Sequence, residues 1–430
     1  MRYFADLHIH SLYSRATSKQ MILEDIEEAA AIKGINVVGT GDFTHPQWFQ
    51  SLKEKLEPAE EGFYKLKSSF SKLADSQKST VRFVITGEIA NIYSRGGRVR
   101  RIHNLIILSS LEAAEKVNNA LSWQGNLKAD GRPILGLDSE ELLSIVMKLD
   151  PQALFIPAHI WTPWFGIFGS MSGFDSLEEA FGDNTKYLAA LETGLSSTPE
   201  MNWRLSALDK FTLVSNSDAH SLDNLGREAN VLDTDFNYSA FREVIVNKDK
   251  QKFLYTIEFF PEEGKYHYDG HRLCQVCFSP EQTKEVRGIC PRCHKPLTIG
   301  VLNRVDQLAD RRQVSLSDSN NFIPFKKLVP LKEIIANVLK TGVKTKLVND
   351  YYNKLIQRFS SEFNILLNVT PEELVEFTDP LIVSGIVNVR SERLNIKPGY
   401  DGEYGKIEIF SATEAQKQKH LSPETQLGLW

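Results

Sequence analysis

The chain has 430 residues, which is enough for two or three domains and excludes a single small binding module. Hydrophobic residues at 42% and charged residues at 24% are typical of a globular protein and exclude a mainly disordered, collagen-like or coiled-coil chain. The formal net charge of −5 means that binding to a nucleic acid requires local basic patches. Because no run reaches about 18 apolar residues, we expect a cytoplasmic protein without membrane contact.

Residues 1 to about 250 alternate short apolar runs with amphipathic stretches, a pattern that predicts βα units around a parallel sheet or barrel. The first unit is complete. A strand over Tyr3–Ile9 is followed by a helix from the N-cap Ser18 to Gly34, and then by a strand over Ile35–Thr40. The other predicted strands are Val81–Thr86, Ile102–Leu108, Ala153–Pro157, Tyr187–Glu192 and Phe211–Ser215. The fold class is therefore α/β.

The composition changes near residue 251 and divides the rest of the chain into three parts. Residues 251–300 contain all four cysteines in a segment too short for its own hydrophobic core. Residues 301–411 have mainly helical patterns, and residues 412–430 form a polar tail with an apolar end. We expect an α/β domain over 1–250, a cysteine-containing domain over 251–300, a helical domain over 301–411 and a flexible tail over 412–430.

Histidine and carboxylate side chains follow the predicted strands. His8 and His10 lie two positions apart on one strand, which places both rings on the same side. The further members of the set are Asp42, His45, Glu88, His103, His159, Glu192, Asp218 and His220. The carboxyl ends of barrel strands meet on one face, so these side chains would share a pocket. The pattern predicts a multimetal hydrolase site suited to phosphoester cleavage, although any single member, such as His103, could be a hydrogen-bonded core residue.

Several segments together resemble the polymerase and histidinol phosphatase (PHP) superfamily: DLHIHSLYS, GTGDFTHP, the GE pair ending at Glu88, the isolated His103 and His159, and NSDAH. The resemblance implies a distorted seven-fold (β/α) barrel with two or three divalent metals, Zn²⁺ with Mn²⁺ or Mg²⁺ as alternatives. It implies the catalytic residues His8, His10, Glu88, His103, His159, Asp218 and His220.

The resemblance also implies how these ligands divide between the ions. The first ion takes His8, His10, Glu88 and Asp218. The second takes Glu88, His103 and His159, and His220 belongs to a third. This chain departs from the family pattern after the second strand, so Asp42, His45 or both would complete the third site. Glu192 has two interpretations, a role behind the ligands or an ion pair with an arginine.

The four cysteines form two pairs with the same spacing. Cys274 and Cys277 are separated by two residues, as are Cys290 and Cys293, with twelve residues between the pairs. This spacing predicts a zinc ribbon in which four thiolates hold a structural Zn²⁺ that replaces the missing core. Two disulfides or a redox role are the alternatives, and the absence of an export signal argues against disulfides.

Three features indicate a polymeric substrate with a phosphate backbone. Residues 265–312 contain nine basic and five acidic side chains. Guanidinium groups suit phosphate, and a basic run lies between Glu88 and His103; the alternative is a solvated loop. That run contains Arg95, Arg98, Arg100 and Arg101. The loop after His159 contains Trp161, Trp164, Phe165 and Phe168, which either form a small core or stack on bases.

The PHP-like barrel, the zinc ribbon and the helical C-terminal part follow one another in this order. In this arrangement the chain resembles the endonuclease Q family over nearly its whole length. The resemblance implies a DNA repair endonuclease, nucleoid-associated when it acts. It would hydrolyse the phosphodiester 5′ to a deaminated base (hypoxanthine or uracil) or an abasic site and leave a 3′-OH and a 5′-phosphate. A small-molecule phosphoesterase of the histidinol phosphatase type and a non-catalytic nucleic-acid-binding protein are the alternatives.

The last residues read QLGLW and resemble the short bacterial sliding-clamp-binding peptide. The resemblance implies a bacterial source and a DNA sliding clamp as partner, bound through Gln426, Leu427, Leu429 and Trp430. Apolar side chains at the end of a polar tail need a partner pocket, unless the tail docks on its own protein.

Overall fold

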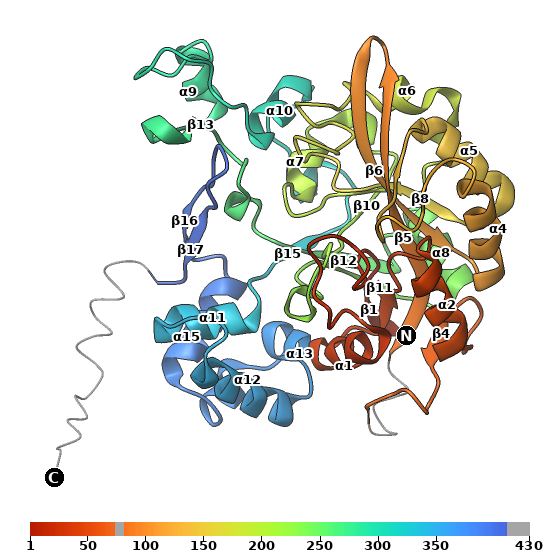
Figure 1. Cartoon of the computed structure of the whole chain (residues 1–430). Helices are drawn as coiled ribbons and strands as arrows, with labels where there is room; N and C mark the ends of the chain where they lie inside the picture. Colours follow the sequence, from red (N-terminus) through yellow and green to blue (C-terminus); the bar gives the residue numbers. More distant parts are fainter. Residues whose placement is uncertain (74–80, 411–430) are drawn as a thin grey trace.

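The computed structural model describes residues 1–73 and 81–410. It shows a mixed α/β fold with a helical C-terminal region, as Figure 1 illustrates. The large sheet and its helices form one body, the cysteine segment extends from it, and helices α11 to α15 pack together near α1 (Figure 1). None of the described helices is long and apolar enough to cross a membrane.

All seven strands predicted from the sequence are present, most of them shorter than expected and two of them longer. They are β1 (Arg2–Asp6), β2 (Val37–Gly39), β5 (Arg82–Arg95), β6 (Arg98–Leu108), β8 (Leu154–Pro157), β9 (Ala190–Glu192) and β10 (Thr212–Val214). β9 and β10 pair with each other in a separate two-stranded sheet. The other five belong to a large sheet, which also contains β3 (Leu56–Pro58), β4 (Tyr64–Leu66), β7 (Ile134–Leu135), β11 (Ala229–Asp233), β12 (Phe253–Glu258) and β15 (Phe325–Lys327). This sheet therefore includes strands from beyond residue 250.

The sheet is only partly parallel, which corrects the expectation of a parallel one. β1, β2 and β5 are parallel neighbours, as are β9 and β10, but β6 is antiparallel to both β5 and β8. The reason lies in the connection between β5 and β6. Only Gly96 and Gly97 separate them, both with positive φ (62° and 72°), which is the geometry of a tight hairpin and leaves no room for a crossover helix.

The strands that carry the predicted ligands are joined by further backbone contacts. Ala189 N donates to Phe155 O at 3.1 Å and links the start of β9 to β8. Ile9 and Ala219 form a parallel bridge, which joins the ends of the segments that follow β1 and β10. These contacts bring the carboxyl ends of β1, β2, β8, β9 and β10 to one region.

Helix α1 (Leu23–Lys33) shows one expectation confirmed and one wrong. It ends at Gly34, which is in the left-handed region with a φ of 89°. It begins after Ile22 with no side-chain cap, so Ser18 is not the N-cap. Ser18 Oγ instead accepts from Gln20 N at 3.2 Å, and its carbonyl accepts from Met21 N in a turn before the helix.

The helices around the sheet are α2 (Pro46–Lys55), α4 (Leu111–Leu121), α5 (Ser139–Leu149), α6 (Leu177–Phe181), α7 (Pro199–Trp203) and α8 (Tyr238–Val246). All but α2 and α7 begin at a side-chain cap; Ser110 accepts from Ala113 N, and Asp138 accepts from Glu140 N. Their apolar faces bury Val117, Leu142 and Phe241 against the sheet.

The rest of the chain forms the cysteine segment and the C-terminal helices. Their elements are β13 (Asp269–His271), β14 (Val276–Phe278), α9 (Pro280–Glu285), α10 (Val301–Leu308), α11 (Leu331–Leu339), α12 (Lys346–Phe359), α13 (Glu362–Leu367), α14 (Pro371–Val375), α15 (Pro380–Arg390), β16 (Asn395–Lys397) and β17 (Lys406–Glu408). A buried ion pair joins α1 to α13, with Lys33 Nζ 2.8 Å from Glu362 Oε2. Tyr268 and Tyr400 form a bridge that ties the cysteine segment to the chain between β16 and β17.

Candidate metal centre

Glu88 lies at the centre of the predicted ligand set. Its Oε1 is 2.8 Å from His103 Nδ1, 3.0 Å from His159 Nε2 and 3.6 Å from His8 Nε2. Its Oε2 is 3.5 Å from His10 Nε2. The carboxylate therefore touches histidines on both sides, which is the arrangement needed to bridge two ions.

The described residues form three overlapping groups around this carboxylate, and the possible ligand atoms of each group lie within 4.8 Å of one another. These groups are His8, His10 and Glu88; Glu88, His103 and His159; and His10, Asp218 and His220. Asp218 Oδ1 lies 3.0 Å from His10 Nε2 and 3.8 Å from His8 Nε2, so it borders the first group as well. The structure thus brings together seven of the nine residues predicted as ligands at this site.

One atom of the cluster shows that the residues suit a cation. His8 Nε2 is buried and has no hydrogen-bond partner, although it faces both Glu88 and Asp218. A buried polar nitrogen without a partner is costly, and an ion at this point would use it as a ligand. The donor set of imidazoles and carboxylates is the one that Zn²⁺ and Mn²⁺ accept.

The charge of the site leads to the same conclusion. Burial disfavours protonated His8, but the carboxylates of Glu192 and Glu88 outweigh burial and hold the pKa of this histidine well above its usual value. Burial likewise disfavours ionised Glu88, yet His103, Arg132 and His8 hold the pKa of its carboxyl well below its usual value. The carboxylates thus hold positive charge on the His8 imidazole, and a cation bound there would take the place of its proton.

Two buried carboxylates orient the first two histidines from behind. Glu192 Oε1 and Oε2 each lie 3.0 Å from His8 Nδ1, and Glu192 also accepts from Asn216 Nδ2 at 2.9 Å and from the His159 backbone N at 2.8 Å. Asp42 Oδ1 lies 3.0 Å from His10 Nδ1. Such contacts fix the ring orientation and leave Nε2 free to bind an ion. Of the two interpretations of Glu192, the structure favours the role behind the ligands.

Asp42 and His45 do not join any of the three groups, contrary to the expectation that they complete the third site. The other oxygen of Asp42 accepts from Ser11 N at 2.7 Å and lies 2.9 Å from Ser14 Oγ, so both of its oxygens have partners. The His45 ring stacks on Tyr13 with 4.2 Å between centroids. The third group consists instead of His10, Asp218 and His220.

The backbone at three of these positions is strained. Asp42, His159 and Asp218 have φ values of 47°, 31° and 46°, in the left-handed region that non-glycine residues rarely adopt. Each lies just after a strand, where an abrupt turn directs the side chain toward the cluster. Strain of this kind persists where surrounding contacts hold it, and it concentrates at functional sites.

The sequence analysis did not identify Arg132 as a site residue. Its Nη1 lies 3.1 Å from Glu88 Oε2, and its side chain is 24% exposed, whereas Glu88 is fully buried. Asp218 and His220 are similarly accessible, at 25% and 27%. Arg132 therefore lies at the open side of the cluster, where a substrate would arrive. The sequence contains no signal for this contact, because Arg132 is 44 residues from Glu88 and lies outside any predicted strand.

A second cluster is present in the cysteine segment. The possible ligand atoms of His271, Cys274, Cys290 and Cys293 lie within 4.8 Å of one another. Cys277, which was predicted as a ligand, is not part of this group. The four cysteines form no disulfide in this structure.

The predicted basic run occupies the β5–β6 hairpin, which projects beyond the sheet (Figure 1). Arg95 is engaged in ion pairs with Asp138 and Glu140, at 3.2 and 3.0 Å. Arg100 donates to Gly173 O and lies 4.0 Å from the Phe174 ring centroid. Arg98 is exposed and Arg101 half-buried, and neither has an ion pair among the described residues. Of the four, Arg95 is thus the one neutralised by carboxylates, and Arg98 is the most exposed to an external phosphate.

The aromatic loop after His159 divides between core and surface. Trp161 and Phe168 are buried in the core and cannot stack on a base in this conformation. Trp164 is 38% exposed, and Phe165 packs on His103 with 4.3 Å between centroids. The predicted clamp-binding residues Gln426, Leu427, Leu429 and Trp430 lie outside the described residues.

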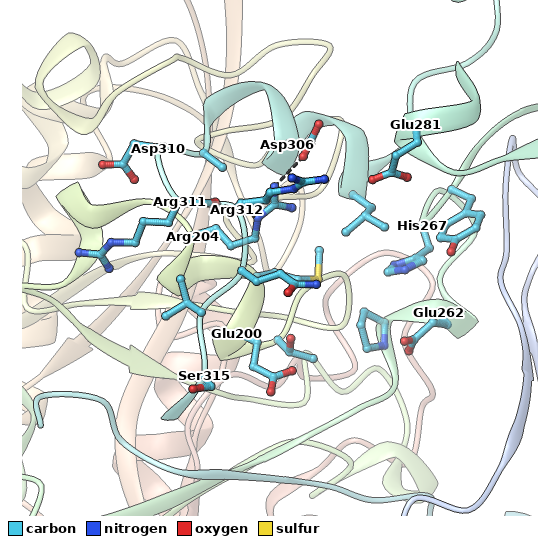
Figure 2. Close-up of a pocket in the computed structure, with 18 of the residues that line it drawn as sticks. Glu200, Arg204, Glu262, His267, Glu281, Asp306, Asp310, Arg311, Arg312 and Ser315 are labelled. Atoms are coloured by element: carbon cyan, nitrogen blue, oxygen red, sulfur yellow. Dashed lines mark hydrogen bonds and ion pairs between the residues drawn. The ribbon is translucent and has the colours of Figure 1, made fainter. Parts of the chain in front are cut away.

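Two cavities are lined by residues outside the cluster. The larger, about 1260 Å³, lies between α7, α10 and the cysteine segment. Figure 2 shows its charged side chains, among which Arg204 binds Asp306 at 2.6 Å, while Arg311 binds Asp209, outside the lining, at 2.6 Å. The smaller, about 200 Å³, is lined by Thr162, Trp164, Tyr266 and His267, among others.

The chain has relatives in archaea and bacteria. Residues 330–393 match the family described as the MJ0043 C-terminal domain. Over 278 residues the chain is 30% identical to the uncharacterized protein MJ0043 of Methanocaldococcus jannaschii, which covers 63% of this chain. The chain spans only one third (33%) of the length of that protein. It is 29% identical over 420 residues to the uncharacterized protein YqxK of Bacillus subtilis, covering 94% of this chain and 98% of YqxK.

Solved structures match over nearly the whole chain. The lesion-specific endonuclease PfuEndoQ of Pyrococcus furiosus has a TM-score of 0.82 and 30% identity, covering 98% of this chain and 100% of its own. Endonuclease Q in complex with a 27-mer duplex substrate that carries an abasic lesion at the active site has a TM-score of 0.81, with the same identity and coverage. With a shared fold, full coverage and this identity, the chain belongs to the endonuclease Q family.

Proposed function

We propose that this protein is a metal-dependent DNA repair endonuclease that cuts the phosphodiester 5′ to a deaminated base or an abasic site. One observation carries the proposal: three histidine and carboxylate groups are linked to one another through Glu88 and His10, in a chain that matches endonuclease Q over 98% of its length. The endonuclease Q complex contains duplex DNA with an abasic lesion, which supports the substrate class.

The strand pairings support a distorted seven-fold barrel as the frame of the site. The ladder from β1 through β2, β5 and β6 reaches β8, and the hydrogen bond from Ala189 N to Phe155 O leads on to the β9–β10 pair. The bridge of Ile9 and Ala219 then leads back to the segment after β1. The antiparallel β6 would be the distortion. In such a frame the ligands at successive strand ends converge on one face.

In the proposed reaction, divalent ions would supply a nucleophile at neutral pH and neutralise charge on the transferred phosphate. His8 and His10 with Glu88 would hold one ion, and His103 and His159 with Glu88 a second. Asp218 and His220 would remain for a third, because His10 Nδ1 contacts Asp42 and its one other nitrogen can bind only one ion. Glu192 and Asp42 fix the imidazoles of His8 and His10 so that Nε2 faces the ions. Arg132, at the accessible side, is placed to orient a phosphate oxygen.

The smaller cavity is our candidate for the place of a nucleotide turned out of the duplex. Trp164 and Tyr266 form aromatic walls, with ring centroids 5.4 Å apart. His267 Nδ1, at the same cavity, is buried without a partner and could bind a base edge. Thr162 Oγ1 lies 2.9 Å from His159 Nδ1, so the cavity borders a metal-binding residue. A base in this position would lie next to the reacting phosphate.

Trp164→Ala tests the role of this cavity by comparing cutting at a uracil with cutting at an abasic site. A stacking role predicts slower cutting at uracil and little change at an abasic site, which has no base to stack. Trp123→Ala, at a tryptophan that is 89% exposed, is the matched control. Equal loss on both substrates would mean that Trp164 maintains the loop rather than contacting a base.

The activity itself is tested by nicking of duplexes that contain uracil, hypoxanthine or an abasic site, with release of phosphate from small monoesters measured in parallel. His8→Ala and Asp218→Asn should abolish nicking and leave DNA binding nearly unchanged. Fast monoester turnover without nicking would instead support a small-molecule phosphatase. A chain that binds DNA but contains no metal beyond the cysteine cluster would support a non-catalytic binding protein.

We propose the sliding clamp as a partner on the sequence QLGLW alone. Removal of residues 426–430 should abolish co-elution with a bacterial clamp and leave nicking of short duplexes unchanged. Unchanged co-elution would exclude these residues as the binding site. A clamp partner also implies that the protein acts at the nucleoid.

A further inference from the structure

The two cysteine pairs and the neighbouring His271 give five side chains that could hold a structural zinc, one more than a tetrahedral site needs. Four of them are grouped: His271, Cys274, Cys290 and Cys293. Within the group, His271 Nδ1 lies 3.3 Å from Cys293 Sγ, close to the separation of two ligands on one tetrahedral ion. The fifth, Cys277, lies outside the group.

The β13–β14 hairpin explains why Cys277 is excluded. Its register pairs Val276 with His271 and Cys277 with Gly270. Val276 packs with Cys290 and Leu297 in a small apolar cluster that Cys274 and Cys293 also contact. Because neighbouring side chains of a strand point to opposite faces, Cys277 points away from this cluster.

The opposite face of the hairpin is already covered by another part of the chain. A Cβ at Gly270, the partner of Cys277, would lie 2.4 Å from the Tyr400 ring, so Tyr400 packs directly on this face. Asp269 and Glu403 both act electrostatically on the Cys277 thiol, and neither belongs to the zinc-binding group. Cys277 is therefore part of the contact with the chain between β16 and β17.

The backbone shows which residues form the two zinc knuckles. After Cys293, His294 is left-handed with a φ of 58°, and its N donates to Cys290 O at 2.9 Å. After Cys274, Gln275 is left-handed with a φ of 52°, and its N donates to Arg272 O at 2.9 Å. In both places a ligand pair with two intervening residues is followed by a left-handed residue. Cys277 is followed instead by Phe278, a residue of β14.

The first knuckle is thus HRLC, from His271 to Cys274, and matches CPRC, from Cys290 to Cys293. The overlapping CQVC, from Cys274 to Cys277, has the same spacing but the wrong backbone. We infer that the structural zinc is held by His271 Nδ1 and the thiolates of Cys274, Cys290 and Cys293, and that Cys277 is an uncoordinated thiol. The inference stands independently of the proposed nuclease function.

Alkylation of the unaltered, zinc-loaded chain tests the inference without any substitution. A small reagent such as iodoacetamide, followed by peptide mass spectrometry, should modify Cys277 well before the three cysteines bound to zinc. After a chelator removes the zinc, all four should react. Protection of Cys277 to the same degree as the other three, lost on zinc removal, would overturn the proposal.

Cobalt substitution gives a second measurement that reports only on thiolate ligands. Co²⁺ bound by three thiolates and one imidazole should keep its thiolate charge-transfer band in Cys277→Ser. Cys274→Ser, the matched control, removes one of the three thiolate ligands, so the intensity of this band should fall by about one third. His271→Ala should weaken Co²⁺ and Zn²⁺ binding to this site, with His271→Cys restoring it. A weakened band in Cys277→Ser together with an unchanged one in His271→Ala would contradict the inference.

Discussion

Arg132 Nη1 lies 3.1 Å from Glu88 Oε2, so a partly exposed cation touches the carboxylate shared by two of the ligand groups. The approach depends on the preceding glycine. A Cβ at Gly131 would lie 2.2 Å from Asp42 Oδ2, which means that the chain passes directly against the carboxylate that orients His10. The pair thus connects the metal centre to the surface at which a phosphate would bind.

We expect Arg132→Ala to slow cutting by about 10²-fold or more while the metal content stays the same, because loss of a donor that stabilises transition-state charge costs this much. Arg132→Lys should recover only part of the rate, since an ammonium lacks the paired donors of a guanidinium. Single-turnover nicking and metal analysis check both statements. Loss of bound metal in Arg132→Ala would show that this residue maintains the centre rather than binding phosphate.

Glu192→Gln should reduce metal affinity by roughly 10- to 100-fold, the usual effect of removing a carboxylate that orients a ligand histidine. Glu192 contacts His8 Nδ1, Asn216 and the backbone of His159, so it positions two ligands at once. Titration of metal into the metal-free protein measures the change. Recovery of the nicking rate at high Mn²⁺ would support a positioning role, and a defect that no metal concentration relieves would contradict it.

We expect some arginines of the β5–β6 hairpin to bind DNA and another, Arg95, to stabilise the fold. Arg98→Ala and Arg101→Ala should each weaken DNA binding, and each lost phosphate contact should lower the slope of log affinity against log salt by about 0.9. Arg95→Ala should instead lower the thermal unfolding midpoint, because Arg95 holds Asp138 and Glu140. A salt slope unchanged in both Arg98→Ala and Arg101→Ala would place the DNA elsewhere.

The protein should become less stable as the pH rises from 5 to 8. Burial raises the pKa of Glu258 to about 8, and the nearby Glu192 also raises it, whereas an unfolded glutamate has a pKa of about 4.3. The folded state holds this proton when the unfolded state has released it. The contribution of Glu258 to the free energy of unfolding is therefore fully present below about pH 4.3. Above that pH it falls by up to about 1.4 kcal/mol per pH unit, until the pH reaches the pKa of Glu258 in the folded state, about 8.

Glu258→Gln should remove most of this pH dependence, because its amide cannot ionise. Thermal unfolding at pH 6 and pH 8 measures the effect, with Glu243→Gln at an exposed position as the control. If the unaltered chain and Glu258→Gln lose stability in parallel over this interval, other groups are responsible. The buried neighbour Glu228, whose pKa is also raised by burial and by Glu258, would be the first of these.

The seven strands, the ligand types that follow them and the paired cysteines were predictable because each depends on local features. Strand and helix periodicity report which face of an element is buried, and short spacings report which side chains can share an ion. For this reason His8, His10, Glu88, His103, His159, Asp218 and His220 could be identified from the residues that surround them and from their family resemblance.

Contacts between distant segments could not be predicted in this way. Whether Asp42 binds an ion or supports His10, and whether Arg132 reaches Glu88, depend on how chain segments separated by tens of residues pack together. The antiparallel β6 and the choice of His271 over Cys277 depend on which face a hairpin presents. Spacing is identical for HRLC and CQVC, and only the register of β13 on β14 and the left-handed turn after Cys274 distinguish them.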